Sequence, residues 1–114
     1  MPINIYQLIA DITAVSTEVV THDVTTLQGF SERQLKAIAQ QAAYVAKGIA
    51  AGEISEETRG FFLTGLEDMA LNYAKTLHGL NSIVIEKVWN GVVSVIWKAI
   101  SSATGLVFPT HFSG

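Results

Sequence analysis

The sequence predicts an all-α protein, a four-helix bundle-like domain with a central helical hairpin over residues 31–80 and an apolar C-terminal helix. Apolar residues recur at steps of three and four, which is the spacing of one helix face. Serine, asparagine and glycine stand between the periodic segments, where helices begin and end. With 114 residues, the chain is long enough for one core, and we expect a single domain over 1–114.

The first helix is predicted over about residues 4–27. Its apolar residues at helical spacing are Ile5, Ile9, Ile12, Val15 and Val19. Residues 13–26 are rich in threonine and valine, which favour strands, but the apolar spacing does not alternate by two. We therefore predict a helix that ends before Gly29.

The second helix is predicted over residues 31–51. Ser31 is placed as its N-cap, and Gln34 three residues later completes the spacing of a capping box. The apolar stripe consists of Leu35, Ile38, Ala42, Val45 and Ile49. Gly52 follows where a left-handed C-terminal residue is expected.

The third helix is predicted over residues 55–79, with Ser55 as its N-cap. Its apolar stripe is Phe62, Leu66, Met69, Tyr73, Leu77 and Leu80. The short link from the second helix makes the two helices antiparallel neighbours. Gly60 and Gly65 each cost about 1 kcal/mol relative to alanine inside a helix, and we interpret them as positions of close helix contact.

The fourth helix is predicted over residues 81–104, capped by Asn81 and ended by Gly105. Its apolar residues form two stripes, so its buried face is wide, as in a central bundle helix, an oligomer seam or a membrane-facing helix. The stripes are Ile85, Val88, Val92, Val95, Ala99 and Trp89, Val93, Ile96, Ile100. An extended tail, 105–114, follows, and its Phe108 and Phe112 are expected to dock.

The sequence offers no motif for catalysis, cofactor binding or metal binding. It has no cysteine, and His22, His78 and His111 stand in separate segments. It lacks the GxSxG elbow of hydrolases and the Glu-x-x-His pattern of di-iron bundles. The net charge is −3 and the seven basic residues are scattered, which argues against nucleic-acid binding.

The charge pattern also predicts a cytoplasmic location. No lysine or arginine precedes the first apolar run, so no secretory signal is indicated, although export by another route stays open. The uncharged stretch between Lys87 and Lys98 is ten residues long. A spanning helix needs about 20.

The preferred functional hypothesis is a non-enzymatic structural or interaction protein, of the kind common among phage and secretion-associated proteins. Charged residues make up 15% of the chain, against about 25% in typical domains. Apolar surface is therefore expected to be covered by a second copy or another protein. The predicted contact residues are Trp89, Val93, Ile96, Trp97, Ile100, Phe108 and Phe112.

Two alternatives remain. In the first, the protein is membrane-active, toxin-like or lysis-related, and its C-terminal helix engages a membrane surface with Trp89 and Trp97 at the interface. In the second, the bundle holds a small apolar ligand. The residues that would line such a pocket are Phe61, Phe62, Tyr73 and Trp89.

Overall fold

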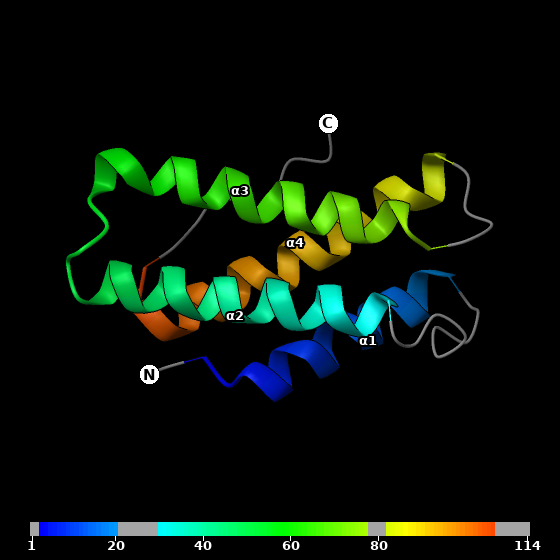
Figure 1. The fold of residues 1–114 in the computed structure, drawn as a ribbon, viewed down its shortest axis with the longest axis horizontal. Coiled ribbons are helices and arrows are strands. Elements are labelled where there is room, and N and C mark those ends of the chain that lie inside the picture. Colours follow the sequence, from blue (N-terminus) through cyan, green and yellow to red (C-terminus); the bar gives the residue numbers. More distant parts are fainter. Residues whose placement is uncertain (1–2, 21–29, 78–81, 107–114) are drawn as a thin grey trace.

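The computed structural model describes residues 3–20, 30–77 and 82–106. This part of the chain contains four helices and no strand: α1 (Ile5–Val20), α2 (Phe30–Ala50), α3 (Glu56–Lys75) and α4 (Ser82–Thr104) (Figure 1). The predicted all-α fold is confirmed. The predicted helical residues 21–27, 78–79 and 81, and the tail with Phe108 and Phe112, lie outside the described residues.

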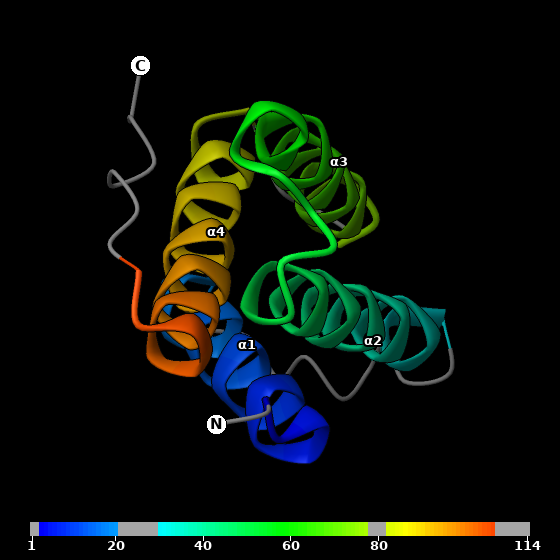
Figure 2. The ribbon, with the colours of Figure 1, turned by 90° about the vertical axis from the view of Figure 1, so that its left-hand side faces the viewer.

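The four helices run alternately up and down, so that successive helices are antiparallel (Figure 1). Seen end on, they form a ring in the order α1, α2, α3, α4, with α1 and α3 at opposite corners (Figure 2). Each helix contacts its two neighbours in the ring, and α2 and α4 also meet across the middle. The core lies between them, and α4 touches all three other helices.

Helix α1 begins after Asn4, whose side-chain oxygen accepts a hydrogen bond from the Gln7 backbone N–H at 3.1 Å. This is an N-cap contact. Among its described residues, α1 buries Leu8, Ile12 and Ser16, spaced four apart. The predicted stripe therefore holds only in part. Within it, Ile12 is buried, while three others, Ile5, Ile9 and Val15, are half-buried.

Helix α2 buries the whole predicted stripe from Leu35 to Ile49. The predicted capping box is wrong, because the helix begins at Phe30 and places Ser31 inside its first turn. The Gln34 side-chain oxygen instead accepts a hydrogen bond from the Thr76 hydroxyl at 3.0 Å, which joins α2 to the end of α3.

The link from α2 to α3 follows the prediction closely. Gly52 has a φ of 77°, and the Glu53 N–H donates to the Gly48 carbonyl at 2.8 Å, the pattern of a Schellman C-cap. The Ser55 side chain then accepts a hydrogen bond from the Thr58 N–H and caps α3.

Two predictions for α3 are wrong. The helix ends at Lys75, with Thr76 as its C-cap, four residues before the predicted end. Gly60 and Gly65 are exposed, and a Cβ added at either would meet nothing within 4 Å. Neither glycine therefore serves a helix contact within the chain.

Close helix contact occurs instead at Gly91 in α4. A Cβ at this position would lie 2.9 Å from Cγ2 of Val15 in α1, which is closer than side chains normally pack. The predicted end of α4 is confirmed, since Gly105 has a φ of 77° and donates its N–H to the Ser101 carbonyl at 2.8 Å.

One buried polar pair crosses the core from α1 to α3. The Tyr73 hydroxyl donates to the Ser16 hydroxyl oxygen at 3.0 Å, and Ser16 donates in turn to the Ile12 carbonyl at 2.8 Å. Both side chains are fully buried. Since α1 and α3 occupy opposite corners, the long tyrosine side chain links the helices that are farthest apart in the ring.

Alkaline pH should weaken the fold through Tyr73. Burial raises the pKa of its hydroxyl above the ordinary value of 10.0, and the hydrogen bond to Ser16 opposes this only in part. Because the folded state holds this proton more tightly, the resulting stability is complete below pH 10.0 and is lost as pH rises through the folded-state pKa.

Chemical unfolding at neutral and at strongly alkaline pH tests this expectation. Tyr73→Phe should cost about 1 kcal/mol at neutral pH, for one lost hydrogen bond. It should also reduce the alkaline loss of unfolding free energy. An equal alkaline loss in both proteins would show that Tyr73 does not carry the effect.

Candidate functional site

The structure places most of the predicted contact residues inside the bundle. Val93, Ile96 and Ile100 are 0% exposed and Trp97 is 8% exposed. Trp89 is half-buried, and its indole N–H donates to the Glu67 carbonyl of α3 at 3.0 Å. These side chains hold α4 against the other helices, so a partner cannot reach the buried ones unless the bundle opens.

Two residues of the predicted ligand pocket, Tyr73 and Phe61, are also not brought together. Tyr73 is fully buried, whereas Phe61 is 80% exposed on the outer side of α3. Phe61 meets the half-buried Phe62 edge to face, with ring centroids 5.6 Å apart and an interplanar angle of 86°. Phe61 is therefore an exposed aromatic side chain that contacts its neighbour Phe62.

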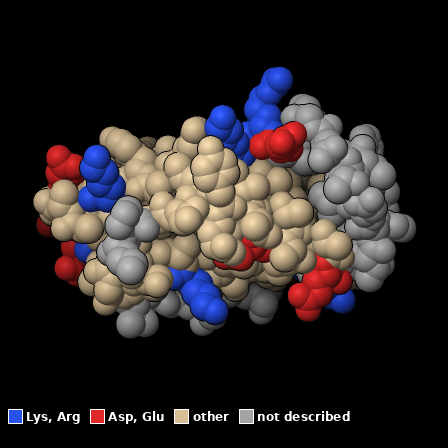
Figure 3. Space-filling view, turned by 90° about the horizontal axis from the view of Figure 1, so that it is seen from below, with Lys and Arg blue, Asp and Glu red and all other residues tan. Residues whose placement is uncertain are grey.

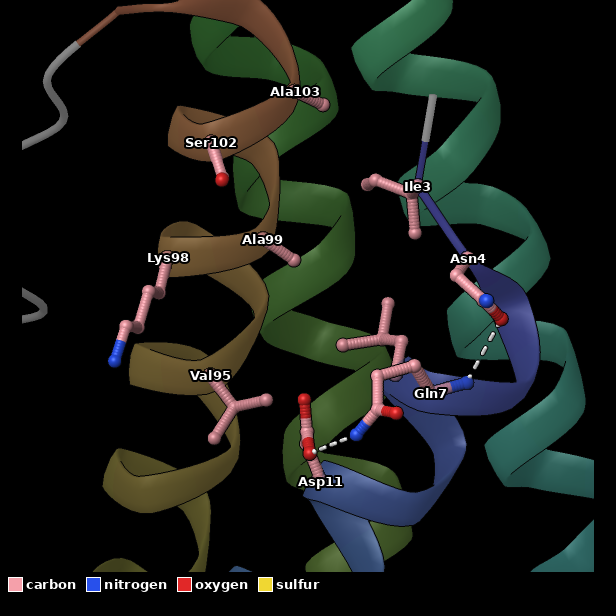
Figure 4. Close-up of a pocket in the computed structure, with 10 residues that line it drawn as sticks. Ile3, Asn4, Gln7, Asp11, Val95, Lys98, Ala99, Ser102 and Ala103 are labelled. Atoms are coloured by element: carbon pink, nitrogen blue, oxygen red, sulfur yellow. Dashed lines mark hydrogen bonds between the residues drawn. The ribbon is translucent and has the colours of Figure 1, made fainter. Parts of the chain in front are cut away.

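A groove of about 460 Å³ lies instead between the start of α1 and the last turns of α4 (Figure 4). We call it the α1–α4 groove. Ile3, Asn4, Gln7, Leu8 and Asp11 line one wall. Val95, Lys98, Ala99, Ser102 and Ala103 line the other.

The groove exists because α4 presents small side chains to α1 at this point. Val95, Ala99 and Ala103 recur every four residues and therefore lie along one helix face. In Figure 4 they point toward Ile3 and α1, and the alanine methyl groups leave the space between the two walls unfilled. The floor is consequently apolar.

The edges of the groove are polar. The Asp11 carboxylate accepts a hydrogen bond from the Gln7 side-chain amide at 2.8 Å and borders the apolar space (Figure 4). Lys98, on the other wall, extends away from Asp11. An apolar floor with a few polar groups at its edge is typical of a binding site.

A second hollow, of about 590 Å³, adjoins the groove and shares Ile3 and Ala103 with it. Its remaining lining residues come from the end of α2 and are Ala43, Ala46, Lys47, Ala50 and Ala51. Five alanines in the lining again leave space where larger side chains would pack. The two hollows therefore flank Ile3 at one end of the bundle.

Few charges surround these hollows. Helix α1 carries Asp11 and Glu18 as its charged residues, and α4 carries Glu86, Lys87 and Lys98, whereas α3 has six charged residues in 20. Figure 3, seen from the side where α1 lies, shows a largely uncharged middle with most charges nearer the edges. Charged residues are thus scarcer on α1 and α4 than on α3.

The described residues include no group of three or more histidine, cysteine or acidic side chains that could hold a metal ion. The three histidines lie outside them. No described helix is long and apolar enough to cross a membrane. No family model, curated protein or solved structure matches this chain.

Proposed function

We propose that this chain is a non-enzymatic structural protein that self-associates, with a second copy of the chain occupying the α1–α4 groove. The observation that carries the proposal is the open apolar groove between Ile3 and Ala99, where α1 and α4, two helices with few charged residues, meet. Apolar surface that is not covered by the chain's own side chains favours association.

Self-association was also expected from the sequence, but the surface proposed here is the α1–α4 groove and not the buried face of α4. The wide apolar face of α4 is buried against α1, α2 and α3. Near its C-terminal end, α4 leaves an edge toward α1 partly open, where Val95, Ala99 and Ala103 are half-buried. Assignment to a phage or secretion-associated assembly, and the cytoplasmic location, remain predictions.

A fluorescent label at the edge of the groove tests the proposal. Because the chain has no cysteine, a single introduced cysteine is labelled specifically. Ser102→Cys places the label at the groove, and Ser94→Cys places it on the same helix outside the groove residues, with both serines exposed. Adding unlabelled protein should change the emission of the Ser102 label much more than that of the Ser94 label.

Two results would contradict the proposal. Equal responses from both labels would mean that association does not involve the groove. A Ser102 response to anionic vesicles but not to unlabelled protein would instead favour the membrane-active alternative, in which this end of α4 meets lipid.

A further inference from the structure

We infer that the side chain entering the groove of the second copy is Phe61 of α3, so that copies join head to tail. This inference rests on the proposed function and specifies its geometry. Phe61 is 80% exposed. Its ring meets that of Phe62 edge to face, and an exposed aromatic side chain is a typical interface anchor.

Two glycines near Phe61 leave the α3 backbone without side chains at those positions. Gly60 precedes Phe61 and Gly65 stands one turn beyond on the same face, and neither carries a side chain that would keep another surface away. A Cβ at either position would meet nothing of this chain within 4 Å. These glycines, which serve no contact within the bundle, would let the walls of a groove reach α3 around the phenyl ring.

The charges around the two surfaces are complementary. Glu57 and Asp68 lie on the same face of α3 as Phe61, four residues before it and seven after it, and both are exposed. Lys98 stands at the edge of the groove, and Lys47 lines the adjoining hollow. Insertion of Phe61 would bring an acidic helix face toward these two lysines, although Asp11 also borders the groove.

The positions of the two surfaces determine the kind of assembly. Helix α3 stands at the corner of the ring opposite α1 (Figure 2), so Phe61 on α3 and the α1 wall of the groove belong to different corners of the bundle. A pair joined by one such contact leaves one Phe61 and one groove unused, so further copies can add until a ring closes or a filament forms. We therefore expect a series of species that grows with protein concentration.

Mixing two variants tests the inference. Phe61→Asp removes the inserting side chain and keeps the groove, whereas Ala99→Glu blocks the groove and keeps Phe61. Each alone should sediment as a monomer, with association weakened about tenfold or more. An equimolar mixture should form a one-to-one dimer and nothing larger, because only one intact pair of surfaces remains. Ile83→Asp, at a residue 66% exposed at the start of α4, is the matched control and should associate normally.

The outcomes separate the inference from the proposed function. If Ala99→Glu dissociates but Phe61→Asp associates normally, and the mixture gains nothing, the groove binds a copy through another surface and the inference is overturned. If Ala99→Glu associates as well as the unaltered chain, the groove is not the interface and the proposed function fails. Circular dichroism of each variant confirms that the helices are retained.

Discussion

Replacing Trp97 by aspartate should unfold the chain. Trp97 is 8% exposed on the core side of α4. The substitution removes a large packed side chain, which typically costs 3–5 kcal/mol, and adds a carboxylate to an apolar site. Because domains of this size are stable by only about 5–15 kcal/mol, little or none of that stability should remain. Far-ultraviolet circular dichroism and a thermal melt measure the loss.

The neighbouring substitution, Lys98→Asp, is the control. Lys98 is exposed, so the same aspartate one residue later should change the free energy of unfolding by about 0.5 kcal/mol or less. If Trp97 belonged to a surface between subunits, the Trp97→Asp protein would be a folded monomer with a normal melt. That result would contradict the burial described above.

The second large effect is expected at Gly91. Valine at this position would force α1 and α4 apart, because even a Cβ would lie 2.9 Å from Cγ2 of Val15. Overpacking of this kind costs about 1–3 kcal/mol. The same valine at Gly60, where a Cβ meets nothing, should be neutral or slightly stabilising, since valine is the better helix former. Urea unfolding of both variants gives the comparison.

A double variant tests the cause of the Gly91 effect. If Val15 is the obstacle, adding Val15→Ala to Gly91→Val should recover part of the lost stability, because the two side chains compete for one space. Equal losses at Gly91 and Gly60, or no recovery in the double variant, would show that α1 and α4 do not approach closely at this point.

The helices were predictable because their signals are local. The stripe from Leu35 to Ile49, the caps at Gly52 and Ser55 and the end at Gly105 each depend on residues within a few positions, and the structure confirms them. The failed capping box shows the limit of such signals. Gln34 instead accepts a hydrogen bond from Thr76, 42 residues away, and local spacing cannot reveal that competing partner.

The location of the proposed interaction surface was not predictable from α4 alone. A helix that is apolar over a wide face has the same sequence whether its own bundle or a second subunit covers it, so the sequence left open whether the bundle itself buries Ile96 and Ile100, as it does. The groove depends on Ile3, which packs near α4 only in the folded chain. The exposure of Phe61 could have been predicted from the sequence, since Phe61 falls outside the apolar stripe that begins at Phe62.

Sedimentation of the unaltered chain and of Ala99→Glu over a range of protein concentrations tests the self-association through the α1–α4 groove most directly. We expect the average mass of the unaltered chain to rise with concentration, while Ala99→Glu remains a monomer of the 12.3 kDa chain with the same helical content. If both proteins are monomers at every concentration, or if the average mass rises equally in both, self-association through the α1–α4 groove is contradicted.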